Sequence, residues 1–243
     1  IWQLRIFSDK DELLHFHRGI FRLKRKIVFD SLAIGMSPFL MNLAACLIVI
    51  LINQGLKKYG GDLAIGAFGI VNRLVFIVVM IVMGLNQGMQ PIVGYNFGAQ
   101  KHDRVKQTLK LSILTGVCIT SSGFLICELF PHAVSAIFTN DQELIDIASR
   151  GVRICVLMFP LVGAQIVIGN FFQSIGKAKI SIFLSLTRQL LYLLPCLLLF
   201  PNWWGLKGIW ISMPVSDALA FITAVVSLII YIKKVSKQHP IAE

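Results

Sequence analysis

Six apolar runs, each long enough to cross a membrane as a helix, constrain this sequence more than any other feature. A bilayer core needs about 20 consecutive apolar residues in a helix. The runs cover residues 32–56, 63–98, 107–130, 143–173, 180–200 and 206–232. Only 14% of the residues are charged, against about 25% in an ordinary soluble domain. The sequence therefore predicts an all-α integral membrane protein, a bundle of six transmembrane helices.

Glycine and proline mark the ends of these runs, at Gly60-Gly61-Asp62, Pro131, Gly176 and Pro201 with Gly205. Such residues punctuate helices. The second run would measure about 54 Å as a straight helix, against a bilayer core of about 30 Å. We therefore expect it to tilt or bend, with Pro91 as the natural place for a bend.

The basic residues predict the orientation. The N-terminal segment, the linkers near 101–110 and 177–179, and the C-terminal segment together carry 16 Lys and Arg, and the opposite side carries 3. Lys and Arg accumulate on the cytoplasmic side of membrane proteins. We expect a multi-pass protein of the plasma (inner) membrane with both termini in the cytoplasm. Trp203, Trp204 and Trp210 then form an aromatic belt at the outer boundary.

Polar residues recur on one face of the second run. In helical projection, Asn72, Met83, Asn86 and Gln90 fall within about 60° of each other. Polar groups in a membrane helix face a neighbouring helix or a water-filled path. Gly66, Gly84 and Gly88 lie on another face, which suits close helix packing. The stripe therefore indicates a helix that packs with one face and lines a cleft with another, although the amides serve equally well as bonds between neighbouring helices.

Three charged residues within the runs are candidates for ion coupling or for a structural role: Asp217, Arg73 and Arg188. Counted from the inner ends of their helices, Arg188 lies at about 12 Å and Asp217 at about 22 Å. The difference of about 10 Å argues against a direct pair. Asp217 is then either a coupling carboxylate or a structural hydrogen-bonding group.

Other function classes lack their signatures. The sequence carries no motif of a catalytic nucleophile, phosphate loop or metalloprotease, so we expect no enzyme, no catalytic residue and no metal or cofactor. The net charge of +11 comes from basic segments between apolar runs, which argues for membrane topology and against nucleic acid as a partner. The five cysteines form no CxxC pair and predict small buried side chains.

Four short strings go beyond generic membrane chemistry. They read QPIVGYNFGAQ at 90–100, GKAKIS at 176–181, GLKGIW at 205–210 and PVSD at 214–217. Together they resemble the multidrug and toxic compound extrusion family, MATE, over about residues 30–235. The resemblance implies the carboxy-terminal six-helix lobe of a twelve-helix, two-lobed transporter, with the amino-terminal lobe as its missing partner. Residues 1–30 then correspond to the cytoplasmic connection between the lobes, 31–232 to the lobe, and 233–243 to a cytoplasmic tail.

The resemblance also implies an antiporter in which inward flow of H⁺ or Na⁺ drives export of small organic, often cationic, compounds by alternating access. A cleft between the lobes would hold the substrate. The residues that we expect to line it are Asn42, Asn72, Met83, Asn86, Gln90, Gln165 and Asn170. Some relatives carry carboxylates deep in the first and fourth helices of this lobe, and this sequence has none there. The coupling ion therefore stays open between H⁺ and Na⁺.

Two alternatives remain. A lipid-linked oligosaccharide flippase of the related superfamily would need cations for its phosphates, and Arg73 and Arg188 offer two. A channel or structural membrane subunit would need neither a coupling carboxylate nor a gate. Because one lobe alone would leave its polar cleft face in lipid, we expect no transport by this chain by itself. The chain, which begins with Ile, reads as a fragment of a longer protein.

Overall fold

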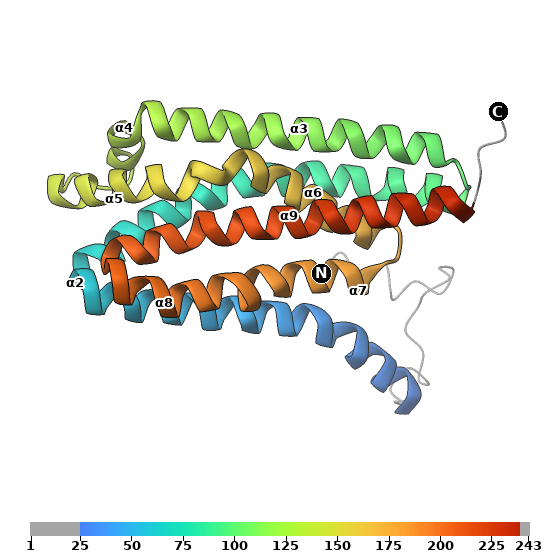
Figure 1. Cartoon of the computed structure of the whole chain (residues 1–243), viewed down its shortest axis with the longest axis horizontal. Coiled ribbons are helices and arrows are strands. Elements are labelled where there is room, and N and C mark those ends of the chain that lie inside the picture. Colours follow the sequence, from blue (N-terminus) through green and yellow to red (C-terminus); the bar gives the residue numbers. More distant parts are fainter. Residues whose placement is uncertain (1–24, 239–243) are drawn as a thin grey trace, which may run out of the picture. The chain divides into compact units, whose positions relative to one another are not determined.

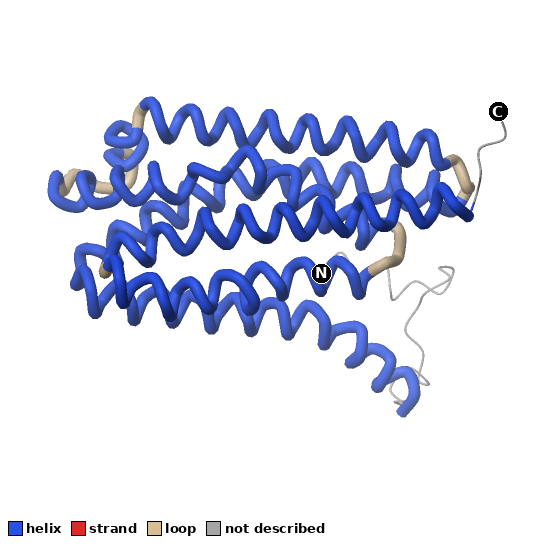
Figure 2. Tube along the Cα trace, viewed as in Figure 1, coloured by secondary structure: helices blue, strands red, loops and turns tan. Residues whose placement is uncertain are grey.

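The computed structural model describes residues 25–238, and this part of the chain is helical with short loops (Figures 1 and 2). In chain order the helices are α2 (Arg25–Gly98), α3 (His102–Leu129), α4 (Pro131–Ala136), α5 (Gln142–Cys155), α6 (Phe159–Ser174), α7 (Ala178–Leu186), α8 (Leu194–Trp204) and α9 (Leu206–Gln238). A 3-10 turn, η2 (Val156–Met158), joins α5 to α6. A π-helical segment, η3 (Thr187–Leu193), joins α7 to α8. No strand occurs among the described residues.

The chain divides within α2 into two compact units, residues 1–42 and 43–243. In the first unit the described residues, 25–42, are helical. Most of the connection predicted at 1–30 therefore lies outside the described residues, as do the last five residues of the predicted tail. The helices from residue 43 onward form the second unit.

A single residue divides α2 into two helices. Gly61 has φ 68° and ψ −165°, and it is the only residue of α2 with a non-helical backbone. Glycine adopts this conformation because it has no Cβ. The break falls in the Gly60-Gly61-Asp62 string, as the sequence predicts. The backbone stays helical through Pro91, so the bend expected there does not interrupt the helix.

Five stretches of the described chain are long and apolar enough to cross a membrane: Asn42–Gly98, His102–Leu129, Gln142–Ser174, Ala178–Trp204 and Leu206–Lys234. The break at Gly61 splits the first of them in two, where the sequence predicts the boundary between the first and second of its six apolar runs. The stretches Gln142–Ser174 and Ala178–Trp204 are less regular than the sequence predicts, because η2 interrupts the first and η3 interrupts the second. Large apolar side chains such as Phe76, Leu114 and Ile222 are more than half exposed, as lipid-facing residues of a membrane bundle are.

The helices meet at small residues, although not at those expected. A Cβ built on Gly163 of α6 would collide with Thr120 and with the backbone of Gly116, both on α3. α3 and α6 therefore pack closely, and they run side by side in Figure 1. Gly84 and Gly88 are exposed and have nothing within 4 Å of an added Cβ. The prediction of close packing is therefore wrong for these two glycines within the described chain, but it holds for Gly66, where an added Cβ would lie 3.1 Å from Leu144 of α5.

Trp210 also departs from expectation. It is 4% exposed and packs on Phe68 at 6.0 Å between ring centroids, whereas Trp203 and Trp204 are 69% and 54% exposed. The belt prediction therefore fails for Trp210, because this position of α9 faces inward. Its ring occupies space that Gly151 of α5 leaves open: a Cβ on Gly151 would lie 2.8 Å from the indole.

Candidate functional site

A cavity of about 220 Å³ lies within the second unit, between both parts of α2, the α5–α6 junction, η3 and α9. Its wall is mainly aliphatic and aromatic, and the polar side chains come from α2, η3 and α9. These polar residues are Asn72, Arg188, Gln189, Ser216 and Asp217. A largely apolar pocket with a few convergent polar groups is the usual form of a small-molecule site.

An ion pair joins η3 to α9 at this cavity. The Nε and Nη2 atoms of Arg188 each lie 2.7 Å from Oδ1 of Asp217. The Asp217 side chain is 6% exposed and the Arg188 side chain is 38% exposed. A carboxylate this deep in a membrane bundle needs a counter-ion, and the guanidinium supplies it.

The prediction that Arg188 and Asp217 lie too far apart to pair is wrong. It counted depth from the inner ends of two helices, which do not lie at one level. The helices share a tight turn at Gly205, where φ is 55°. Counted from that turn, the two residues differ in depth by about 7 Å, a gap that the long arginine side chain bridges.

The π-helical segment η3 begins one residue before Arg188. A π-helix widens the turn, and such segments are frequent at functional sites. The next residue, Gln189, also lines the cavity, and its buried Oε1 atom has no hydrogen-bond partner among the described residues. The segment therefore brings an arginine and an amide oxygen without a partner to the wall of the cavity.

The structure places the other predicted residues elsewhere. Met83 and Gln90 are exposed on α2, and Arg73 is exposed next to Asn72 without lining the cavity. Asn86 is 3% exposed, and neither of its amide atoms has a partner among the described residues. The predicted stripe thus combines exposed residues with one at the edge of the core.

The remaining amides are less exposed. Gln165 and Asn170 of α6 are half-buried. The amide nitrogen of Asn170 donates to the Ile166 carbonyl at 3.0 Å, and Gln165 Oε1 is buried without a partner among the described residues. Asn42 is exposed and belongs to the first unit. Of the predicted site residues, the structure brings together Asn72, Arg188 and Asp217.

Sequence reasoning missed Gln189 and Ser216 as lining residues. Each is next in the chain to a charged residue that the sequence analysis named as a candidate. This proximity was the signal that could have identified them. The Oγ atom of Ser216 donates to the Met213 carbonyl at 2.7 Å, and its side chain is buried with Asp217. No feature of the sequence marks residues 187–193 as a π-helix.

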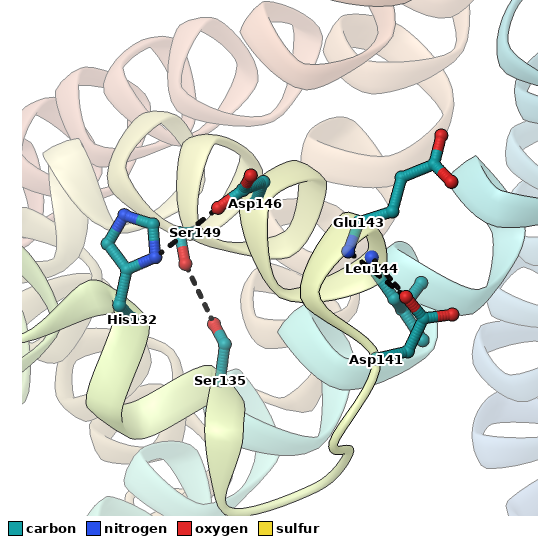
Figure 3. A network of polar contacts seen from close by, with 7 residues as sticks. All are labelled: His132, Ser135, Asp141, Glu143, Leu144, Asp146 and Ser149. Atoms are coloured by element: carbon teal, nitrogen blue, oxygen red, sulfur yellow. Dashed lines mark hydrogen bonds and ion pairs between the residues drawn. The ribbon is translucent and has the colours of Figure 1, made fainter.

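A second polar cluster holds the α4–α5 end of the bundle together (Figure 3). Asp141 caps α5 by accepting hydrogen bonds from the backbone of Glu143 and Leu144. Ser149 bonds Ser135 at 3.4 Å. These are local structural contacts: an N-cap satisfies the free amides of a helix start.

Comparison with known proteins identifies the family. The MatE family model matches residues 33–198. The multidrug export protein MepA of Staphylococcus saprophyticus is 26% identical over 226 residues, which cover 93% of this chain and 49% of the relative. MepA of Staphylococcus aureus MSSA476 is 24% identical over 230 residues, with coverage of 93% and 49%. The chain thus spans about half the length of the curated relatives it matches.

Solved structures show the same relation. The MATE multidrug transporter DinF-BH is 37% identical with a TM-score of 0.76, over 93% of this chain and 50% of that one. An inward-facing multidrug resistance MATE family transporter of the MOP superfamily is 18% identical with a TM-score of 0.84, over 97% and 55%. The second likeness concerns the fold alone. Because the family model covers more than half of its residues, the chain belongs to the MATE family.

Proposed function

We propose that this chain is one lobe of a cation-coupled multidrug antiporter that exports organic, often cationic, compounds by alternating access. The observation that carries the proposal is the match to MATE proteins over nearly the whole chain and only half of each relative. An amino-terminal six-helix lobe completes the transporter, and the substrate cleft lies between the two lobes.

The exposed polar residues of α2 suit the cleft wall. Asn72, Met83 and Gln90 are exposed on the part of α2 that follows Gly61. An amide donates and accepts hydrogen bonds, and a methionine thioether adapts to apolar surfaces of different shape. This combination suits binding of varied organic cations. For Asn42, Asn86, Gln165 and Asn170, the expected place in the lining stays a prediction.

Asp217 is the candidate coupling group of this lobe. While it is ionised, its charge is neutralised by Arg188 at 2.7 Å. A proton on Asp217, or a cation in place of the guanidinium, would remove the counter-ion of Arg188. An unpaired guanidinium in a bundle is costly, so Arg188 would then turn toward water and change the packing of η3 against α9. The alternative role for Asp217 is purely structural.

The flippase alternative has less support. It relies on free cations for phosphate groups, but Arg188 is paired with Asp217 and Arg73 does not line the cavity. The antiporter proposal includes the predicted orientation, in which the protein lies in the plasma membrane with both termini in the cytoplasm.

Reconstitution tests the proposal. Proteoliposomes would carry either this chain alone or this chain fused to the amino-terminal lobe of its own reading frame, with ethidium as the organic cation. We expect the two-lobe protein to transport ethidium when a proton or Na⁺ gradient is imposed, and the chain alone to transport none. Transport by the chain alone would overturn the single-lobe proposal, and two-lobe transport without any gradient dependence would overturn the coupling.

The Asp217→Asn variant of the two-lobe protein then tests the coupling role of Asp217. If the ion dependence of transport is unchanged in this variant, the role of Asp217 is structural.

A further inference from the structure

A second hollow, which shares no lining residue with the cavity at the ion pair, lies between α5 and the start of α9. Its volume is about 440 Å³. One part of its lining is apolar, from Ile147, Ile154, Leu206 and Trp210, and the other part is cationic, from Arg150, Arg153 and Lys207. No acidic side chain lines this groove. We call it the α5–α9 groove.

Two of the three cations are uncompensated. Arg153 is paired, with its Nε atom 2.8 Å from Oε1 of Glu128. Arg150 and Lys207 are exposed and have neither a hydrogen bond nor an ion pair within residues 25–238. The carboxylate one turn before Arg150, that of Asp146, is directed at His132 instead, 3.6 Å away (Figure 3).

The start of α9 adds to the positive potential. Lys207 is in the first turn of this 33-residue helix, and that turn carries no acidic residue. The free amides of a helix start already favour an anion and disfavour a cation. The lysine, the helix start and Arg150 therefore all favour negative charge in a groove whose other side chains are apolar, apart from the paired Arg153.

The groove lies at the level of a membrane surface. Trp203 and Trp204, which end α8 just before the turn into α9, are 69% and 54% exposed. Exposed tryptophans gather where the hydrocarbon meets the headgroups. A ligand here would place its charge among headgroups and its apolar part against Trp210 and the isoleucines.

We propose that the α5–α9 groove binds an anionic phospholipid. The phosphate would pair with Arg150 and Lys207, and an acyl chain would occupy the apolar wall beside Trp210. The charge arrangement argues for this occupant, because a zwitterionic lipid offers no net charge to two free cations. The site is independent of the transport activity proposed above, so either proposal can fail alone.

Trp210 supplies a reporter inside the groove. The full chain with Trp2→Phe, Trp203→Phe and Trp204→Phe retains only this tryptophan. Reconstituted in phosphatidylcholine nanodiscs, it would receive phosphatidylglycerol or phosphatidylcholine with brominated acyl chains, at equal mole fractions. Bromine quenches indole fluorescence on contact, so quenching measures lipid occupancy at the groove.

We expect phosphatidylglycerol to occupy the groove up to about twenty-five-fold more strongly than phosphatidylcholine, at about fivefold for each of the two cations. Arg150→Gln with Lys207→Gln should reduce this preference to less than about twofold. The matched control, Lys57→Gln with Lys58→Gln, removes the same charge from exposed positions that do not line the groove, and it should keep the preference.

Three results would overturn the proposal: equal quenching by both lipids, a preference that survives in the Arg150→Gln, Lys207→Gln variant, or relief of quenching by soluble glycerol phosphate. The last would show a phosphate site that makes no use of the apolar wall. Loss of the preference in both double variants would also count against the groove, since it would indicate a response to overall charge.

Discussion

The structure predicts that the two residues of the Arg188–Asp217 pair differ in how much their substitution destabilises the chain. Arg188→Gln would leave the Asp217 carboxylate, with a side chain 6% exposed, without a counter-ion. Asp217→Asn would leave a guanidinium that is already 38% exposed and can turn further toward water. We therefore expect the arginine substitution to destabilise the chain more than the aspartate substitution, and the double substitution to recover most of the loss.

The interaction free energy between Arg188 and Asp217 can be worked out from the distance between their charges. Two unit charges about 4 Å apart attract by about 1 kcal/mol in water and by about 4 kcal/mol at an effective dielectric constant of 20. One partner is buried and the other is partly exposed, so we expect a coupling energy of about 2 kcal/mol. We expect Arg188→Gln alone to cost about 3 kcal/mol, because it leaves a buried charge unpaired.

The assay is a double-mutant cycle. Unfolding of the chain in mixed micelles, driven by a rising fraction of denaturing detergent and followed by helical circular dichroism, gives the free energy of each variant. A coupling energy below about 0.5 kcal/mol, the usual scatter for independent sites, would refute the reasoning. Equal losses for the two single variants would refute the asymmetry, and with it the link between burial of Asp217 and its dependence on Arg188.

Three further predictions use the same unfolding assay. Gly163→Ala should cost about 1–3 kcal/mol because its methyl group would collide with Thr120, whereas Gly169→Ala, in the same helix with nothing within 4 Å, should cost little; equal effects would contradict the close α3–α6 contact. Asn86→Leu should stabilise the chain by about 1 kcal/mol because it removes a buried amide without a partner, and a loss of stability would reveal a partner. Asp141→Ala should cost about 1 kcal/mol through loss of the α5 cap, and an unchanged midpoint would contradict that cap.

Much of the architecture could be predicted from the sequence, because the bilayer constrains which backbone structures can cross it. Backbone groups in hydrocarbon must bond within their own helix, so apolar length predicts the spans, and glycine predicts where they end. The break at Gly61 and the turn at Gly205 fall at glycines, which adopt a positive φ more readily than other residues because they have no Cβ. The family could also be predicted, because strings such as QPIVGYNFGAQ are more specific than the apolar composition that any membrane helix shares.

The site depended on tertiary structure. Helical projection treats each helix as a regular cylinder and cannot show which face meets a neighbour. It therefore grouped Asn86 with exposed residues, assigned close packing to Gly84 and Gly88, and placed Trp210 in a surface belt. Depth counted along isolated helices separated Arg188 from Asp217, although the shared turn and the long arginine side chain join them.

By itself the sequence determined an all-helical membrane lobe of the MATE family, since hydrophobic length and local backbone preference act within short segments. Only the tertiary structure decided which polar groups meet. A salt bridge, a cavity or a cationic groove is formed by residues far apart in the chain, such as Arg150 and Lys207. Their juxtaposition depends on how helices pack and where a π-helical segment shifts the register, and neither is encoded in the pattern of any single helix.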